Sequence, residues 1–472
     1  MDLVGLTIQE VKRNFKKGEY NPEELLSEVK KQIDKQDDTL HAFVLKTYEK
    51  AEEALANKSG KLSGIPASIK DNYNWIGTAT TASSNILRNY ISPYNATVTQ
   101  RLLDAGACFV GKTNMDAFAH GSSTETSDFF ITLNPHNKDH VAGGSSGGAA
   151  AAVASGMSVY SIGSETAGSV RGPAAWCGLV GFAPTYGRFS RYGVVAMASS
   201  LDRPGVLTNS VEDSAILTEI LSGHDRQDAT SINESPMKLV EKLLQEKDLK
   251  GMRIGLPKQF FDDRIEPQVL KAVEEATRQL EKMGAKLIEV DFLDPKYTIA
   301  VYTVINRSEI SSNLARIDGI RYGYRSNKKA ETILDQIAYN RGEGFGNEAK
   351  QRCMTGAYTL SAGYYDAYYK KAQQVRTMII EDFKKAFEKV DVVVGPTMPT
   401  TAPKVGVTKD NPIYGELADE LTEPSALAGL PCISVSVGKD SKGLPIGMQV
   451  IGRQMDEFNV LKAAHIFEKS DK

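Results

Sequence analysis

Hydrophobic and polar positions near the N-terminus follow a helical period. Apolar residues recur at three- and four-residue spacing among many charged ones, which predicts helices over residues 7–16, 23–35 and 48–56. Asn21 before Pro22 is a typical helix start, with Asn as the N-cap and Pro at the first helical position. We therefore expect a helical arm over about residues 1–58 that packs outside the rest of the protein.

Short apolar runs and helical periods alternate along the rest of the chain. Extended runs are expected at 62–70, 107–110, 159–162, 252–256, 286–290 and 391–396, and helices at 97–105, 149–156, 211–222, 267–283 and 417–429. The runs 432–437 and 446–451 are expected to pair as a hairpin. This alternation predicts a sheet with parallel strands covered by helices. The i, i+4 spacing of Tyr364, Tyr365, Tyr368 and Tyr369 favours packing on a long helix over chemistry.

Composition and charge narrow the class of protein. Of 472 residues, 41% are hydrophobic and 24% charged, an ordinary soluble balance that can bury a large core. Lys plus Arg number 56 against 59 Asp plus Glu, for a formal charge of -3. This near-neutral balance argues against a chain that holds nucleic acid by itself. Any nucleic-acid partner is more simply held by another subunit.

The cysteines and the N-terminal sequence bear on location. Cys108, Cys177, Cys353 and Cys432 are scattered and form no C-x-x-C pair, which favours a reducing compartment and argues against a zinc site. The first residues lack a basic segment followed by an apolar run, and no stretch reaches transmembrane length. We expect a cytoplasmic protein with no metal and no membrane contact.

One stretch matches a nucleotide-binding motif in its residues but not in the elements predicted around it. Residues 106–113, Gly-Ala-Cys-Phe-Val-Gly-Lys-Thr, match the P-loop pattern. A P-loop follows a strand and opens a helix. Here a helical period precedes the string, and residues 107–110 are themselves an apolar strand pattern. We therefore expect no nucleotide site at this position.

Two turns rich in small residues carry the candidate nucleophiles. Residues 143–148 read Gly-Gly-Ser-Ser-Gly-Gly, and residues 163–175 begin Gly-Ser-Glu-Thr-Ala-Gly-Ser. Such turns allow close backbone approach, and their successive N–H groups form anion-binding nests. Ser145, Ser146 and Ser169 are thus presented where a nucleophile and an oxyanion hole can be built. A flexible linker would not enclose a helix and a strand between its two ends.

Lys70 is the candidate base for these serines. Alternation along residues 62–70 places Ile65, Ala67 and Ile69 on one face and Lys70 on the other, at the end of an apolar run and outside any charged patch. None of the six histidines falls in the two serine turns. A Ser-His-Asp triad stays open, because triads are assembled in space. The more economical alternative is a Ser–Ser–Lys relay.

These motifs resemble the amidase signature family, whose hallmark is a G-G-S-S-G-G turn followed by a G-S-[DE]-x-x-G-S-x-R-x-P-A-type segment. Within it the chain is most similar to the A subunits of aspartyl/glutamyl-tRNA amidotransferases, almost end to end. Further matching stretches are residues 184–193, 198–202, 313–325 and 360–371. The resemblance implies an α/β fold: one domain over residues 1–472, with a single large mixed β-sheet covered by helices on both faces.

The resemblance also implies roles in a relay: Ser169 as nucleophile, Ser145 as bridge and Lys70 as terminal base. Lys70 must then be neutral, and lowering its pKa from ~10.4 to about 7.4 disfavours the charged form by roughly 4 kcal/mol. This requires burial away from carboxylates, so Asp71 is expected to point elsewhere. The candidates for the oxyanion hole are the backbone N–H groups of Thr166, Ala167, Gly168 and Ser169.

The implied substrate is glutamine, with its ammonium on Asp419 and its carboxylate on Arg352, and with Ser123 and Tyr302 as further contacts. The ammonia released would pass to a partner subunit that activates misacylated Glu-tRNA(Gln) or Asp-tRNA(Asn). The implied assembly is a heterotrimer with B and C subunits. ATP and Mg²⁺ would be used by the partner, which would also hold most of the tRNA, and this chain would need no cofactor.

Four departures from the family pattern keep two alternatives open. Relatives usually carry Asp and Gly where this chain has Glu165 and Ala167, and commonly Ser and Glu where it has Ala149 and Ala117. If the backbone at position 167 needs a positive φ, alanine costs roughly 1–2 kcal/mol. The alternatives are a free-standing amidase for another small amide and a weakly active scaffold. Which misacylated tRNA is used also stays open.

Overall fold

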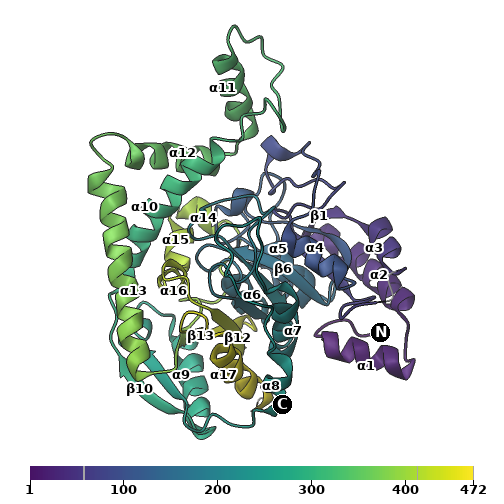
Figure 1. Cartoon of the computed structure of the whole chain (residues 1–472), viewed down its shortest axis with the longest axis vertical. Coiled ribbons are helices and arrows are strands. Elements are labelled where there is room, and N and C mark those ends of the chain that lie inside the picture. Colours follow the sequence, from purple (N-terminus) through teal and green to yellow (C-terminus); the bar gives the residue numbers. More distant parts are fainter. Residues whose placement is uncertain (57–58, 412, 471–472) are drawn as a thin grey trace.

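A large sheet runs through the chain that the computed structural model describes, residues 1–56, 59–411 and 413–470. Its strands are β1 (Phe43–Lys46), β2 (Pro66–Lys70), β3 (Cys108–Thr113), β6 (Tyr160–Glu165), β7 (Val180–Ala183), β8 (Arg203–Thr208), β9 (Arg253–Pro257), β10 (Lys286–Val290), β11 (Val392–Pro396), β12 (Cys432–Lys439) and β13 (Pro445–Gly452). The order of these 11 strands is β1-β3-β2-β6-β8-β7-β12-β13-β11-β9-β10. The two edge strands, β1 and β10, lie on opposite sides of the molecule (Figure 1). β2 is parallel to β3 and β6, and β9 is parallel to β10 and β11. The other neighbours are antiparallel, including the predicted hairpin of β12 and β13, so the mixed sheet is confirmed.

Helices cover both faces of this sheet, as predicted. They are α1 (Ile8–Lys17), α2 (Pro22–Leu40), α3 (Tyr48–Ala54), α4 (Thr97–Asp104), α5 (Gly147–Ala154), α6 (Arg171–Cys177), α7 (Val211–Leu221), α8 (Val240–Gln245), α9 (Pro267–Lys282), α10 (Pro295–Leu314), α11 (Ile333–Gly344), α12 (Asn347–Leu360), α13 (Lys371–Lys389), α14 (Val407–Asp410), α15 (Tyr414–Ala418), α16 (Glu423–Leu427) and α17 (Glu457–Ser470). Gly447 and Gly452 are an odd number of positions apart in β13 and therefore face opposite sides. An added Cβ on Gly447 would meet Ala175 of α6, and one on Gly452 would meet Val460 of α17.

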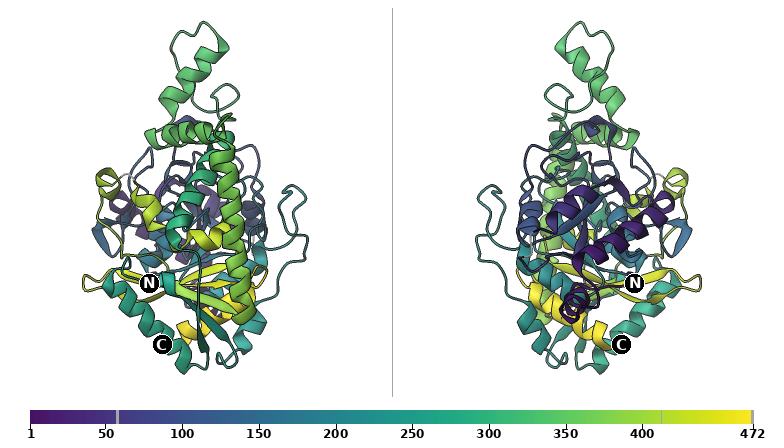
Figure 2. Two further views of the ribbon diagram at one scale, coloured as in Figure 1. Left: turned by 90° about the vertical axis from the view of Figure 1, so that its left-hand side faces the viewer. Right: turned by 90° about the vertical axis from the view of Figure 1, so that its right-hand side faces the viewer.

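The N-terminal arm is helical but also contributes to the sheet. The predicted caps are present: Asn21 accepts a hydrogen bond from the N–H of Glu24, and Pro22 begins α2. The sequence prediction missed β1, which is only four residues long and lies between two helices. It pairs antiparallel with β3 and so ties the arm to the sheet. Figure 2 shows α1–α3 on the side of the molecule away from α13. Residues 57–58 of the predicted arm lie outside the described part.

The single helix predicted over residues 417–429 is wrong. Two short helices, α15 and α16, take its place, with Asp419 and Thr422 in the break between them. Pro424 lies in the first turn of α16. Because proline has no N–H and clashes with the preceding turn, a continuous helix cannot pass through this position. The break matters because it places Asp419 at a helix end and not on a helix face.

The tyrosine cluster also differs from its prediction. Gly363 adopts a φ of +88°, and a turn followed by a π-helical segment, η4 (Asp366–Lys370), precedes α13 in place of one long helix. Tyr364, Tyr365 and Tyr368 are 40–45% exposed. Tyr364 and Tyr368 pack on each other and on Tyr358, outside the core.

The P-loop string forms a strand and no phosphate cradle, as expected. β3 covers Cys108–Thr113, and the side chain of Lys112 is fully buried. None of the helices in the described ranges combines the length and the apolar character needed to cross a membrane.

Candidate functional site

Lys70 and the first serine turn meet at the end of β2. Lys70 Nζ donates to Ser145 Oγ at 2.7 Å, to Ser146 Oγ at 2.9 Å and to the carbonyl oxygen of Ser164 at 3.0 Å. The peptide bond between Gly144 and Ser145 is cis. Side chains are excluded at the turn's glycines: a Cβ on Gly144 would overlap the carboxylate of Asp116. The structure thus brings two of the three predicted relay residues into hydrogen-bond contact.

Burial determines the protonation of Lys70. The side chain is fully buried, and its three hydrogen-bond partners are uncharged. Desolvation lowers the pKa of Lys70 to about 7, against the charges of Asp116, Asp202 and Glu165, which raise it. An amine in this state can accept a proton near neutral pH.

Asp71 points away from Lys70, as strand alternation predicts. Its carboxylate lies 3.0 Å from Lys112 Nζ, and both side chains are buried. Ile69 and Lys112 are register partners in the parallel pair β2–β3, which puts Lys112 on the face opposite Lys70. The lysine of the P-loop string is therefore the counter-ion of Asp71.

Ser169 lines a narrow pocket beside this relay. Its carbonyl oxygen accepts a hydrogen bond from the N–H of Ser146 at 3.1 Å, which joins the two serine turns. The pocket has a volume of about 20 Å³, room for roughly one water molecule. Its walls are Ala119, Gly121, Ser122, Ser169, Met197, Tyr302, Arg352, Gly415, Glu416 and Asp419. Three of the predicted substrate contacts therefore line it together with Ser169.

The predicted oxyanion-hole donors are the backbone N–H groups of residues 166–169. Within the described ranges, no residue accepts a hydrogen bond from the N–H groups of positions 166–169. Ala167 is not among the non-glycine residues with a positive φ. Alanine is therefore unstrained at this position. The cost that alanine would carry at a positive φ does not apply at position 167. Gly168 closely approaches the segment between α15 and α16, since a Cβ there would lie 2.6 Å from Asp419 Oδ1.

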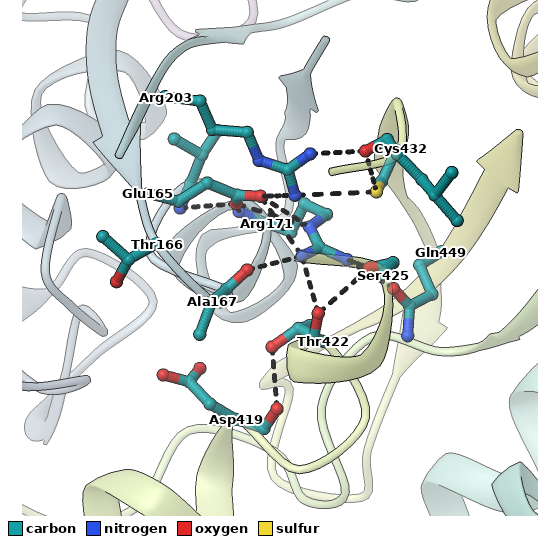
Figure 3. Close-up of polar contacts among 12 residues, drawn as sticks. Glu165, Thr166, Ala167, Arg171, Arg203, Asp419, Thr422, Ser425, Cys432 and Gln449 are labelled. Carbon is teal, nitrogen blue, oxygen red and sulfur yellow. Dashed lines mark hydrogen bonds and ion pairs between the residues drawn. The ribbon is translucent and has the colours of Figure 1, made fainter. Parts of the chain in front are cut away.

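Glu165 and Arg171 connect the second serine turn to the segment around α16. Figure 3 shows Arg171 between Ala167, Thr422 and Gln449. Its guanidinium donates to the carbonyl oxygens of Ala167 at 2.5 Å and Thr422 at 3.1 Å, and to Gln449 Oε1 at 2.7 Å. Glu165 is paired with Arg171 at 3.2 Å and with Arg203 at 2.7 Å.

These two pairs hold Glu165 ionised. Burial works against its charge, but the two guanidinium groups outweigh burial and lower the pKa of Glu165. The longer side chain at position 165 is therefore accommodated by two cations. Ala149 is fully buried within α5, and Ala117 is buried in the 3₁₀ turn η2 (Ala117–Ala119); nothing in the structure explains these two departures further.

Asp419 is a buried acid with one unpaired oxygen. Its Oδ2 accepts from Ser122 Oγ at 2.7 Å, whereas Oδ1 has no hydrogen-bond partner among the described residues. Burial raises the pKa of Asp419 to about 7, and the hydrogen bond from Ser122 opposes this shift. The free oxygen lies at the pocket and is suited to an ammonium group.

Arg352 is buried but already paired. Its Nε donates to Glu348 Oε1 at 2.6 Å and its Nη1 to Asn306 Oδ1 at 3.2 Å. Burial disfavours its charge, but Glu348 and Glu416 outweigh burial and raise the pKa of Arg352. Tyr302 lies between this arginine and the second serine turn: its hydroxyl accepts from Asn306 at 3.2 Å and shares a 2.6 Å hydrogen bond with Thr166.

Ser123, unlike the other predicted substrate contacts, is not among the residues that line the pocket. Its hydroxyl donates to Glu125 at 3.0 Å, while the neighbouring Ser122 contacts Asp419 and lines the pocket. Ser122, Arg307 and Glu416 are not among the residues that the sequence predicted for the site. The adjacent serines gave a local signal for Ser122, but no local pattern marks Arg307 or Glu416.

No metal centre emerges from the described part of the chain: it has no group of three or more His, Cys, Asp or Glu side chains arranged to hold an ion. Ser145 Oγ receives its hydrogen bond from Lys70. The geometry therefore favours a lysine-based proton relay over the histidine triad that the sequence left open.

Comparisons with known proteins identify the relatives of this chain. The family model described as Amidase matches residues 24–461. The A subunit of glutamyl-tRNA(Gln) amidotransferase from Halothermothrix orenii is 48% identical over 471 residues, which cover 100% of this chain and 98% of the relative. The crystal structure of the same-named protein from Thermotoga maritima superposes with a TM-score of 0.83 at 41% identity, over 99% of this chain and 95% of that one. A 6-aminohexanoate cyclic dimer hydrolase shares the fold, with a TM-score of 0.87 at 23% identity over 100% of this chain and 98% of that one. The chain belongs to the amidase family.

Proposed function

We propose that this chain is the glutamine-hydrolysing subunit of a tRNA-dependent amidotransferase, and that it supplies ammonia for amidation of Glu-tRNA(Gln), Asp-tRNA(Asn) or both. The observation that carries the proposal is the buried Lys70, with a pKa of about 7, 2.7 Å from Ser145 and beside the pocket that Ser169 lines. Full-length relatives that carry the name of the glutamyl-tRNA(Gln) amidotransferase A chain support the choice of reaction.

In the proposed reaction, neutral Lys70 accepts a proton from Ser145, which in turn accepts one from Ser169. Ser169 Oγ attacks the side-chain amide carbon of glutamine, and backbone N–H groups of residues 166–169 stabilise the oxyanion. The proton returns through the relay to the leaving nitrogen, so ammonia departs and an ester on Ser169 remains. Water, deprotonated by the same relay, hydrolyses the ester to glutamate and restores Ser169.

The pocket reads the two charged groups of the amino acid. Asp419, with its free Oδ1, receives the ammonium group. Arg352 receives the carboxylate, because a planar guanidinium donates two parallel hydrogen bonds. Tyr302 supports this end through Thr166 and Asn306. Ser123 is retained as a further contact through its position next to Ser122.

The proposed assembly contains B and C subunits. The partner that receives ammonia would bind ATP and Mg²⁺ and hold most of the tRNA, which accords with the formal charge of -3 on this chain. The proposed serine chemistry needs no cofactor here. A cytoplasmic location is supported by the four cysteines, all free thiols in the described part of the chain.

A glutaminase assay with and without the partner subunits tests the proposal. We expect glutamine hydrolysis that is coupled to amidation of misacylated tRNA when the B and C subunits co-purify. Hydrolysis of simple amides without glutamine turnover or partners would make the chain a free-standing amidase. Stable association without turnover would make it a scaffold.

A further inference from the structure

The arginine end of the pocket contains two guanidinium groups and two carboxylates of the chain itself. Arg352 on α12 donates to Glu348 at 2.6 Å. Arg307 on α10 donates to Glu416 Oε1 at 2.7 Å, and the same oxygen lies 3.8 Å from Arg352 Nη2. Glu416 therefore lies between the two arginines and is hydrogen-bonded to only one of them.

Glu416 takes up space that a substrate needs. It lines the pocket together with Ser169 and Asp419, and its side chain is 11% exposed. A volume of about 20 Å³ cannot admit an amino acid. Glu416 is one of the walls that limit the space next to Ser169.

The charges at this end already balance. Two guanidinium groups face two carboxylates, so a third carboxylate would meet no net positive charge. His120 does not add one: burial, followed by the charges of Arg352 and Arg307, holds its pKa well below the usual range. The other two acids on this side do not change this balance by a full charge: burial raises the pKa of Asp419 to about 7 and holds that of Glu423 well above its usual range.

The two carboxylates differ in how firmly they hold Arg352. Glu348 lies one turn before Arg352 on α12, and its 2.6 Å bond to Nε orients the guanidinium. Glu416 belongs to the five-residue helix α15 and is too far from Arg352 for a hydrogen bond. Glu416 is therefore the carboxylate that an incoming one can replace.

We propose that Glu416 occupies the carboxylate subsite of the resting pocket and acts as a specificity-determining residue, because a donor's carboxylate must displace it to reach Arg352. This inference rests on the proposed function for the identity of the donor. An internal occupant lowers the apparent affinity by the fraction of molecules in which the subsite is free. It also favours donors whose own carboxylate can replace that of Glu416.

The test compares wild type with Glu416→Gln on two amides. Glutamine carries both an ammonium and a carboxylate, whereas 4-aminobutanamide keeps the amide and the ammonium and lacks the carboxylate. We expect the KM for glutamine to fall at least about fivefold in Glu416→Gln, a typical size for coupled binding, with the KM for 4-aminobutanamide unchanged. Glu348→Gln is the matched control; it should raise the KM for glutamine, because Arg352 loses the partner that orients it.

An unchanged or higher KM for glutamine in Glu416→Gln would overturn the inference, as would an equal fall in KM for both amides.

Calorimetric titration of glutamine into Ser169→Ala and into Ser169→Ala with Glu416→Gln separates a failure of the inference from a failure of the donor assignment. If the two variants bind glutamine equally, glutamine is a ligand and only the inference fails. If neither variant binds glutamine, glutamine is not the donor, and the proposed function and the inference both fail. Tighter binding by the double variant than by Ser169→Ala is the expected result, and it would support both the inference and glutamine as the donor.

Discussion

The relay beside the pocket and the arginine end of the pocket show opposite solutions to burying a cation. Lys70 is fully buried and Arg352 is 7% exposed. Lys70 contacts two hydroxyl groups and a carbonyl oxygen, and its pKa falls to about 7. Arg352 contacts Glu348 and lies near Glu416, and its pKa is raised.

The comparison teaches that the partners of a buried cation decide its chemistry. Burial penalises either charge, but a carboxylate partner more than offsets that penalty at Arg352 and none contacts Lys70 directly. Lysine can lose its proton and serve as a base, whereas arginine stays charged and can only bind. One buried cation is thus suited to proton transfer and the other to recognition.

The largest expected effect concerns the nucleophile at the lysine end. Ser169→Ala removes the attacking oxygen, and kcat should fall at least about 10³-fold, as when a catalytic serine is removed elsewhere. Ser146→Ala is the matched control, because Ser146 also contacts Lys70 at 2.9 Å but is absent from the pocket wall. Mass spectrometry after incubation with a glutamine-like electrophile should find the adduct on the Ser169 peptide. An adduct on Ser146 would contradict the assignment.

The second effect concerns the base. Lys70→Met and Ser145→Ala should each remove most activity, and the double variant should lose little more, because members of a relay act as a unit. In wild type only neutral Lys70 accepts a proton, so kcat should fall as pH decreases through about 7. Below that value the slope should approach tenfold per pH unit. Additive losses, or a kcat independent of pH down to about 5, would show that Lys70 is not the base.

A smaller effect is expected from the acid that reads the ammonium. Asp419→Asn should raise the KM for glutamine about 10- to 100-fold with little change in kcat, the loss expected for a hydrogen bond to a charged group. In wild type this KM should also rise as pH falls below about 7, because Asp419 is then protonated. An amide with the carboxylate but no ammonium should be unaffected. Equal losses on both amides would indicate that Asp419 holds the fold.

The smallest expected effect is at Ala167. Since its φ is not positive, Ala167→Gly relieves no strain and should lower the free energy of unfolding by about 0.5–1 kcal/mol. Denaturant unfolding measures this change, and glutaminase activity serves as the control for local structure. Higher stability of the glycine variant would mean that alanine is strained there.

Sequence patterns predicted the regular elements better than their ends and interruptions. β10 begins and ends where the alternation of residues 286–290 predicts. β1 was missed because four residues are too few for a period to appear. The break before α16 was missed because the apolar spacing continues through Pro424, although its backbone cannot remain helical.

The sequence by itself determined which chemistry is available: two serine turns, a lysine at the end of an apolar strand, and the family motif. These are local, because chain neighbours build each turn and alternation orients each side chain. Only the tertiary structure decided the protonation of Lys70 and the partners of Arg352. Glu416, Arg307 and Glu348 come from α15, α10 and α12, which are distant in sequence and meet through packing. Burial and charge pairing depend on all atoms within a few ångströms, wherever they lie along the chain.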